Sequence, residues 1–357
     1  MRVIIITLIT VFGLLFLIGP LKSQNRELSR IYLPLRLKNE IQIPDEVVKL
    51  PVVAEGMLFY AVKNKIYARD LFTGEQIWSR AFNDMVATEP VYSSGSLYFG
   101  STDYRLYVVD AATGKNEWSF KTKGMINSSP EVSDEAVYFL SLDGLLYKIN
   151  LADQELIWKL RLDVRHAKGL VAASVNLSLG QLFIGTLNGF LYSIDDRKGE
   201  VQWKKHAGKS IETKPVIYED KVIVGTYDRQ VRAYHAGSGE NAWDFFVHGK
   251  IRSSPVVLYD NVYIQSDAGD LYALEAESGR LLWTYDINKS PRDRRPNVSQ
   301  YKIYTTTKNK FVVLDSESGK VLWSYPLVSS NFFSSPLIVN GYVIIQAGNY
   351  LYIFEQS

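Results

Sequence analysis

Seven tryptophans recur at an almost constant interval, and this spacing constrains the fold more than any other feature of the sequence. The intervals between them are 40, 40, 45, 40, 40 and 40 residues. A fixed period of this length is typical of a repeat protein, in which one structural unit is copied along the chain. The tryptophans are Trp78, Trp118, Trp158, Trp203, Trp243, Trp283 and Trp323.

A short phrase, Asp-x-x-Thr/Ser-Gly-x-x-x-Trp, precedes most of these tryptophans. The Thr/Ser-Gly pair predicts a tight turn with Gly at positive φ, and the Asp can accept hydrogen bonds from amides of that turn. We expect the Trp to lie on the next, outer strand, where its ring packs against a neighbouring unit and its N–H finds a carbonyl. The third unit departs most, with Asn150 and Gln154, and His235 and Glu275 replace the Asp in two others. The matching residues, predicted to dock one unit on the next, are Asp70, Asp110, Asp195, Asp315, Gly74, Gly114, Gly199, Gly239, Gly279 and Gly319.

Each unit has the hydrophobic pattern of short β-strands. Apolar and aromatic residues alternate with a period of two, and turns such as Asp143-Gly144 and Asn188-Gly189 separate the runs. These are hairpin signals, and about four strands fit into one unit, which is the size of a propeller blade. The repeats show no helical periodicity. The pattern therefore predicts an all-β propeller.

The end of the chain determines the number of blades. After Trp323 an eighth unit starts at Pro336, but the sequence stops one strand short of completing it. An open edge would expose unpaired backbone, so we expect a strand from residues 33–41 to complete the last blade and close the ring. The prediction is an eight-bladed propeller over residues 33–357, with seven blades as the alternative.

The N-terminus carries a membrane-targeting signal. A basic Arg2 is followed by an uncharged, mainly apolar run over residues 3–18. This length suits either a signal peptide or an uncleaved membrane anchor, which we assign to residues 1–21, with 22–32 as a linker. In both cases we expect the propeller to work outside the cytoplasm, in the periplasm or the cell envelope, with membrane association through the N-terminal segment.

Composition argues against several classes of function. The net charge of +2 gives no basic field for nucleic acid. The sequence has no Cys and four scattered His, which disfavours disulfides, thiol nucleophiles and His-rich metal sites. We predict no catalytic, cofactor-binding or metal-binding residue, and a monomeric protein.

The repeated phrase resembles the PQQ-like repeat family of eight-bladed propellers over about residues 33–357. That family includes quinoprotein alcohol dehydrogenases and the BamB-type scaffold proteins of outer-membrane β-barrel assembly. The resemblance implies for the enzymes a vicinal Cys pair, a Trp floor beneath the quinone and a calcium held by carboxylates. This chain lacks Cys, its tryptophans are assigned to docking, and the remaining carboxylates Asp103, Asp143 and Asp228 lie in predicted turns. The BamB-type resemblance implies a non-catalytic interaction scaffold, but an envelope ligand-binding or sensor propeller and a degenerate quinoprotein dehydrogenase remain alternatives.

Two irregular loops are the candidate partner-binding sites. The long interval between Trp158 and Trp203 holds five extra residues, at the place where the resemblance implies a loop that contacts the barrel-assembly protein. A second loop, residues 288–296, is locally basic and suits an acidic partner or anionic lipid headgroups. Ordinary solvated loops are the alternative for both. The residues assigned to partner binding, through a loop rim or by strand addition, are Arg165, His166, Lys168, Gly169, Arg292, Arg294 and Arg295.

Overall fold

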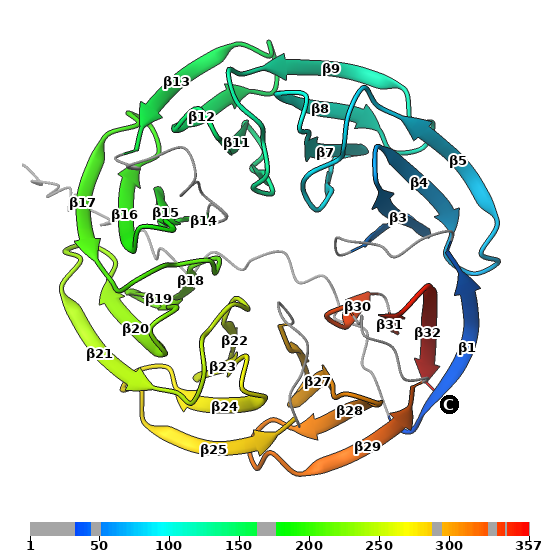
Figure 1. Ribbon diagram of the computed structural model, residues 1–357, viewed down its shortest axis with the longest axis vertical. Coiled ribbons are helices and arrows are strands. Elements are labelled where there is room, and N and C mark those ends of the chain that lie inside the picture. The colour runs from blue at the N-terminus through cyan, green and yellow to red at the C-terminus, as the bar shows by residue number, and fades with distance from the viewer. Residues whose placement is uncertain are drawn as a thin grey trace, which may run out of the picture.

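Eight four-stranded antiparallel sheets follow one another around a ring (Figure 1). The computed structural model describes residues 33–43, 51–162, 176–287, 295–327, 334–339 and 341–356, and every regular element in these ranges is a strand. The predicted all-β, eight-bladed propeller is therefore confirmed, and the seven-bladed alternative is wrong. No helix in the described ranges is long and apolar enough to cross a membrane. The predicted N-terminal signal or anchor (1–21) and linker (22–32) lie outside the described residues.

Each blade starts with a short inner strand and proceeds outward in chain order. Blades 1 to 4 comprise β2 (Val52–Ala54), β3 (Met57–Val62), β4 (Lys65–Asp70), β5 (Gln76–Ala81); β6 (Val91–Ser93), β7 (Ser96–Gly100), β8 (Arg105–Asp110), β9 (Asn116–Lys121); β10 (Glu131–Val132), β11 (Ala136–Ser141), β12 (Leu145–Asn150), β13 (Leu156–Arg161); β14 (Asn176–Ser178), β15 (Gln181–Gly185), β16 (Phe190–Asp195) and β17 (Val201–His206). Blades 5 to 7 comprise β18 (Val216–Tyr218), β19 (Lys221–Gly225), β20 (Gln230–His235), β21 (Asn241–Phe246); β22 (Val256–Leu258), β23 (Asn261–Gln265), β24 (Asp270–Glu275), β25 (Leu281–Asp286); β26 (Asn297–Ser299), β27 (Lys302–Thr306), β28 (Lys310–Asp315) and β29 (Val321–Pro326).

Blade 8 is built from both ends of the chain. It consists of β30 (Leu337–Val339), β31 (Tyr342–Ala347), β32 (Tyr350–Gln356) and, outermost, β1 (Leu35–Gln42). β1 pairs antiparallel with β32, from Leu35 opposite Gln356 to Gln42 opposite Tyr350, with a bulge between Leu37 and Asn39. The prediction that an N-terminal strand closes the last blade is confirmed, with β1 two residues further along the chain than its expected start.

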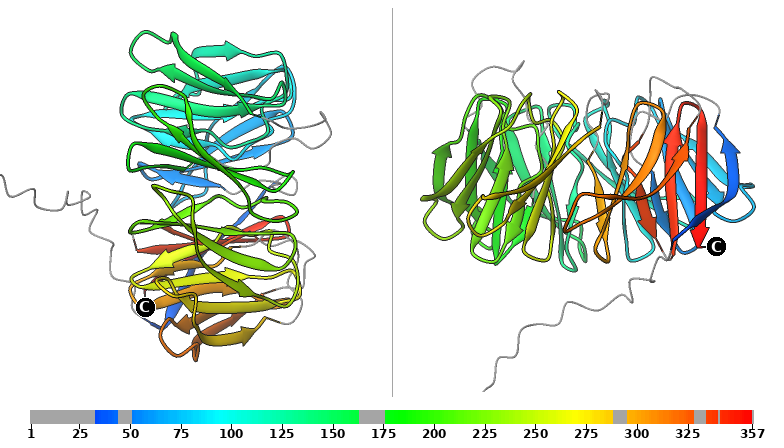
Figure 2. Two further views of the ribbon diagram at one scale, coloured as in Figure 1. Left: turned by 90° about the vertical axis from the view of Figure 1, so that its left-hand side faces the viewer. Right: turned by 90° about the horizontal axis from the view of Figure 1, so that it is seen from below.

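The strand order gives the ring two different faces, seen edge-on in Figure 2. One face carries the turns between first and second strands and between third and fourth strands, together with the start of β1 and the end of β32. We call it the proximal face. The other, the distal face, carries the turns between second and third strands and the connections between blades.

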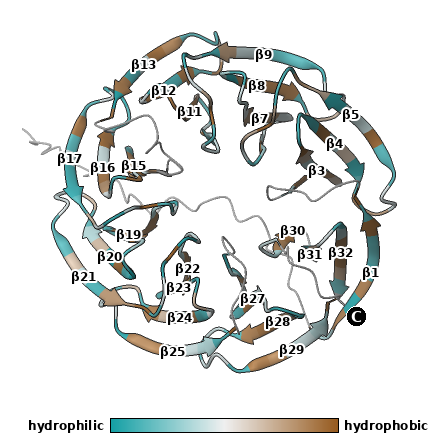
Figure 3. Ribbon diagram, viewed as in Figure 1, coloured by the Kyte–Doolittle hydropathy of each residue, from teal (hydrophilic) through white to brown (hydrophobic). Residues whose placement is uncertain are grey.

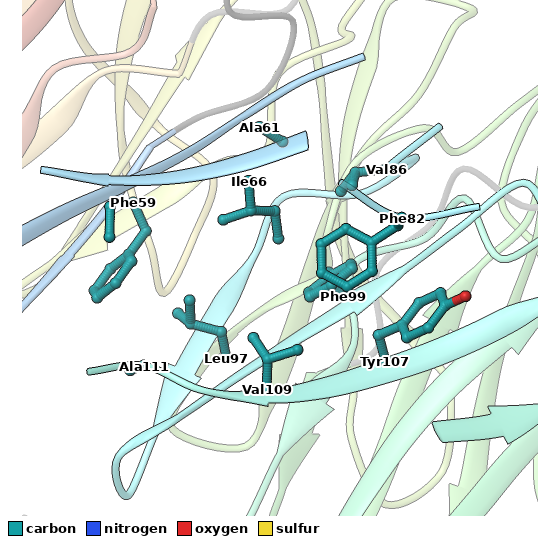
Figure 4. Close-up of a cluster of buried hydrophobic side chains, with 11 residues drawn as sticks. Phe59, Ala61, Ile66, Phe82, Val86, Leu97, Phe99, Tyr107, Val109 and Ala111 are labelled. Atoms are coloured by element: carbon teal, nitrogen blue, oxygen red, sulfur yellow. The ribbon is translucent and has the colours of Figure 1, made fainter. Parts of the chain in front are cut away.

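The hydrophobic core lies between adjacent blades. Between blades 1 and 2, for example, Phe59 and Ile66 of one sheet meet Phe99 and Val109 of the next (Figure 4). Both faces of each sheet are covered by neighbouring blades, and for this reason every residue of β7 and β11 is buried, without the polar alternation of a half-exposed strand. Outer strands such as β17 carry hydrophilic stretches, coloured teal in Figure 3.

The tryptophans lie on the outer strands and join each blade to the next. The Trp203 Nε1 atom, for instance, donates a hydrogen bond to the Ala236 carbonyl of blade 5 at 2.8 Å. The indole lies against the glycine of the next turn, because a Cβ built on Gly239 would be 2.6 Å from Trp203 Cδ2. Gly239 also has a φ of +67°, so both space and backbone conformation require glycine there. The same indole–carbonyl bond joins Trp78 to Ala111, Trp158 to Asp196, Trp243 to Ala276 and Trp283 to Ser316.

Ring closure uses a different residue. The outer strand of blade 8 is β1, and its Ile41 takes the place that an indole has elsewhere: a Cβ on Gly74 would lie 3.1 Å from Ile41 Cγ1. Ile41 is buried in the cluster between blades 8 and 1. Seven tryptophans are thus compatible with eight blades.

The Asp of each phrase holds its turn together. The Asp70 Oδ1 atom accepts hydrogen bonds from the amides of Phe72 at 2.8 Å and Thr73 at 2.7 Å. These amides, with that of Thr73 contributing most, hold the pKa of Asp70 below its usual range. The same amide-to-carboxylate bond is made by Thr113 to Asp110, Lys198 to Asp195 and Ser318 to Asp315.

The turn of the third unit has a non-glycine residue in a strained backbone conformation. Gln154 occupies the position of the phrase glycine with a φ of +64°, a conformation that costs a non-glycine residue roughly 1 kcal/mol. Replacing Gln154 by Gly removes this backbone strain, but glycine loses more backbone entropy on folding, which offsets part of the gain. We therefore expect the variant to be more stable by about 0.5 kcal/mol. Urea unfolding monitored by tryptophan fluorescence measures the change. A less stable Gln154→Gly variant would contradict this account of the turn.

Candidate functional site

The candidate site lies on the wall of the ring's centre in blades 5 to 7, next to the second predicted loop. Of the residues assigned to partner binding, Arg165, His166, Lys168, Gly169, Arg292 and Arg294 fall outside the described residues. Arg295 is described and exposed. Its backbone amide donates to Ser335 Oγ of blade 8 at 2.9 Å, which fixes the end of the loop.

A cavity of about 450 Å³ opens beside Arg295. The inner strands β18, β22 and β26 each pair on one side only, so their other edges border it. Its wall combines aliphatic side chains and prolines with one guanidinium and one amide, which suits an extended segment or a ligand with both an apolar part and an acidic group. The lining residues are Val216, Ile217, Pro255, Val256, Val257, Arg295, Pro296 and Asn297.

A cluster of cationic side chains lies on the distal face of blades 5 and 6. The Tyr227 ring has Lys250 Nζ 4.6 Å and Arg252 Cζ 4.4 Å from its centroid, so two cations share one aromatic ring. Arg252 also has two carboxylate neighbours, with Nη1 3.7 Å from Glu212 Oε2 and Nε 3.6 Å from Asp267 Oδ2. Lys250 is exposed, so this cluster can present positive charge to a partner. We call it the Tyr227 cluster.

An ion pair connects blades that are not neighbours in the ring. Lys214, in the connection that leads to β18, has its Nζ 2.5 Å from Glu131 Oε2 on the inner strand of blade 3. Its backbone amide donates to Ser254 Oγ of blade 6 at 2.8 Å. The Lys214–Glu131 pair therefore crosses the inner side of blade 4, and Glu131 partly neutralises the charge of Lys214.

The turn carboxylates considered for calcium are occupied by local hydrogen bonds. Tyr107 Oη donates to Asp103 Oδ2 at 2.5 Å, and Tyr147 Oη donates to Asp143 Oδ2 at 2.7 Å. Asp228 Oδ1 accepts the Lys209 amide at 3.3 Å. Each carboxylate belongs to a different blade, and among the described residues no group of three or more His, Asp or Glu could hold a metal ion.

The Tyr107–Asp103 bond predicts a dependence of stability on alkaline pH. Burial, followed by the bond to Asp103, raises the pKa of Tyr107 to about 12 from its ordinary value of 10.0. The folded state therefore keeps this proton longer than the unfolded chain, so the stabilisation is complete below pH 10 and is lost as the pH rises towards 12. We expect the difference in free energy of unfolding between wild type and Tyr107→Phe to shrink over that interval. Urea titrations at several pH values measure it, and a constant difference would contradict the assignment.

Sequence reasoning missed the Tyr227 cluster and the Lys214–Glu131 pair. Lys250 and Arg252 are two residues apart, which places them on one side of an extended segment. Their common partner Tyr227, however, comes from the preceding blade, and Glu131 is 83 residues from Lys214. These contacts depend on the ring geometry and leave no local signal.

The fold and its repeated docking turns define a PQQ-like repeat β-propeller. The family model described as "Outer membrane protein assembly factor BamB" matches residues 62–178, 155–297 and 292–356, and the chain belongs to that family. No curated protein sequence matches significantly.

Two solved structures support the fold. BamB from Moraxella catarrhalis is similar with a TM-score of 0.76 and 15% identity, covering 90% of this chain and 100% of that one. The computationally designed Ika8 protein also has a TM-score of 0.76, with 13% identity over 88% of this chain and 98% of that one. At these identities the similarity concerns the fold alone.

Proposed function

We propose that this protein is a non-catalytic interaction scaffold of the cell envelope that takes part in outer-membrane β-barrel assembly. The observation that carries the proposal is the family match, which runs from residue 62 to residue 356 and so involves nearly the whole ring. Membership in a family named for outer-membrane protein assembly supports a protein partner of that machinery. The predicted N-terminal targeting segment supports an extracytoplasmic location.

The described contacts agree with a scaffold role. The turn carboxylates Asp103 and Asp143 bind tyrosine hydroxyls of their own blades, and the tryptophans bind neighbouring blades. Accessible features of the described residues include a cavity bordered by strand edges, Arg295 beside it, and the exposed Lys250 of the Tyr227 cluster. Strand edges and exposed cations are features that bind protein segments, through main-chain hydrogen bonds and charge complementarity.

The test is recovery of the partner from cells. The full-length tagged protein, crosslinked in its native envelope, should co-purify with components of the β-barrel assembly machinery. Lys250→Glu should reduce this recovery, because it reverses the charge of an exposed residue of the Tyr227 cluster.

Lys198→Glu is the matched control, since Lys198 is exposed in a turn on the proximal face. Absence of every assembly component from the wild-type sample would refute the proposal. Equal recovery with both variants would remove the Tyr227 cluster from the interface.

The cavity favours a second candidate function, an envelope propeller that binds a small ligand. A volume of about 450 Å³ accommodates a small molecule, and Arg295 would select an acidic one. Thermal-shift screening with anionic metabolites tests this directly: a shift that disappears in Arg295→Gln would support ligand binding at the cavity.

A further inference from the structure

The two faces of the ring differ in the sign of their exposed charge. The comparison takes the described turns and connections of each face together with the strand residues that flank them. Exposed cations predominate on the distal face and exposed carboxylates on the proximal face, which lie on opposite sides of the disc (Figure 2). The formal net charge of +2 for the whole chain conceals this separation.

The distal face exposes cations on both halves of the ring. Blades 1 to 3 and their connections contribute Lys63, Lys65, Lys121, Lys123 and Arg161. Blades 5 to 7 and their connections contribute Lys209, Arg229, Lys250, Arg295, Lys308 and Lys310. Against these, the exposed carboxylates of the described distal segments are Asp84 and Asp286.

The other distal carboxylates are half-buried, and most of them contact groups inside the protein. They are Glu89, Asp103, Glu131, Asp143, Glu212, Asp228, Asp267 and Asp270. Tyrosine hydroxyls donate to Asp103, Asp143 and Asp270, and the Lys209 amide donates to Asp228. Glu131 pairs with Lys214, and Arg252 lies near both Glu212 and Asp267. When these groups and the half-buried Arg105 are included, cations still outnumber carboxylates on the distal face.

The exposed distal cations keep their charge available. Within the described part of the chain, Lys121, Lys209 and Lys308 form no ion pair. The Arg161 guanidinium donates to the Asp143 carbonyl at 3.2 Å, and Lys250 lies over the Tyr227 ring. Carbonyl and ring are both neutral, so neither contact cancels the charge of its cation.

The proximal face has the opposite sign. Its first turns expose Glu55, Asp134, Glu135, Glu219, Asp220 and Asp260, and the turns of the repeated phrase expose Glu75, Asp153, Glu155, Glu200, Glu240, Glu277 and Glu317. The exposed cations of the same described segments are Lys115, Arg197, Lys198, Arg280 and Lys320. The less exposed Lys221 and Lys302 do not change the sign. An anionic surface would therefore repel this face and attract the other.

The distal face also carries exposed apolar side chains. They are Met85, Tyr104, Met125 and Phe246, with exposed fractions of 51%, 41%, 40% and 69%. The proximal face exposes Tyr259 and Tyr301 among others, so charge, and not apolar exposure, distinguishes the two faces. Apolar side chains on a basic surface can enter the headgroup region of a bilayer, where tyrosine is favoured.

We propose that the distal face is a docking surface for an anionic lipid bilayer. The exposed cations attract anionic headgroups, the acidic proximal face turns away from them, and the distal apolar side chains enter the interface. A bilayer fits this distribution better than an acidic protein segment does, because the cations lie on both halves of a broad face and not along one groove. The inference goes beyond the proposed function, since lipid binding in this orientation requires no barrel-assembly partner.

The absence of Cys from the chain allows the docked face to be identified. Met125→Cys on the distal face and Ala112→Cys in a proximal turn of blade 2 place one thiol each at an exposed position, and each variant receives one nitrobenzoxadiazole label. The full-length proteins are mixed with vesicles of phosphatidylglycerol and phosphatidylcholine in equal parts, or of phosphatidylcholine alone. We expect a blue-shifted, brighter emission at position 125 with the anionic vesicles only, and no change at position 112. The predicted N-terminal segment is the same in both proteins, so its insertion alone would not distinguish the labels.

Charge reversal tests the electrostatic part of the proposal. In the Met125→Cys background, Lys209→Glu with Lys308→Glu reverses two exposed distal charges far along the chain from the label. The lipid concentration for half-maximal emission change at low salt should rise at least about tenfold, and the effect should shrink as salt screens the charges. Lys198→Glu with Lys320→Glu is the matched control, because it makes the same change at two exposed proximal lysines and should leave the midpoint unaltered.

The proposal is overturned if position 125 shows no emission change, or if both labelled positions respond alike. Equal binding to phosphatidylcholine alone, or equal weakening by the distal and proximal pairs, would also refute it. If polyglutamate binds the protein and the anionic vesicles do not, an acidic protein segment is the occupant and the membrane assignment is wrong.

Discussion

Replacing Ile41 by Asp is expected to unfold the ring at its closure. Ile41 is buried between blades 8 and 1 and contacts the site that an indole fills elsewhere, against Gly74. The substitution removes apolar packing and buries a carboxylate without a cationic partner, which should lower the free energy of unfolding by about 3–5 kcal/mol. Urea unfolding followed by circular dichroism and tryptophan fluorescence measures the loss.

The next residue of the same strand provides the control. Gln42 is exposed and pairs with Tyr350 through the backbone, so Gln42→Asp adds the same charge to β1 without entering the core. We expect a change within about 0.5 kcal/mol. Similar losses in both variants would show that charge on β1, rather than packing of Ile41 against blade 1, controls closure.

The second large effect is expected at the contact between a tryptophan and the next blade. Gly239→Ala places a Cβ 2.6 Å from Trp203 Cδ2 at a backbone φ of +67°. The indole is buried and cannot move away freely, so overpacking and backbone strain should together cost about 2–4 kcal/mol. The unfolding midpoint in urea should fall accordingly, with a shift in native tryptophan emission as Trp203 is displaced.

Gly237 is the matched control for this experiment. It lies two residues earlier in the same turn, its φ is outside the left-handed region, and a Cβ there would meet no atom within 4 Å. Gly237→Ala should be neutral or stabilise the protein by about 0.5 kcal/mol. Equal destabilisation in the two variants would mean that the turn as a whole, and not the indole contact, determines the cost.

The fold was predictable because its information is local and repeated. The Trp spacing, the turn glycines and the period-two pattern each specify one unit, and copies of one unit can pack only on each other. The missing strand of blade 8 identified β1, since an unpaired edge is unfavourable. What the repeat did not predict is Ile41 as the counterpart of an indole, because a residue that breaks the repeat has no pattern to reveal it.

The candidate site was less predictable, because its contacts join turns of different blades. Arg295 was assigned from a basic loop, whereas Tyr227, Lys250 and Lys214 were not assigned at all. The stacking of Tyr259 on Tyr301 depends on the distance between two adjacent turns, which the sequence of either turn does not contain. Tyr301 itself is visible in a comparison of the repeats, because the same turn position is occupied by Gly56, Gly95 and Gly180 in blades 1, 2 and 4.

The composition of blade 8 has a consequence for biosynthesis. β1 is made before all seven other blades, whereas its hydrogen-bonding partner β32 is made after all of them. During translation and any export step, β1 therefore remains unpaired until β32 is available. An unpaired, partly apolar strand is the kind of segment that aggregates or binds chaperones. Loss of β32 would leave β1 without its pairing partner, so the ring can close only after both of these widely separated strands have been made.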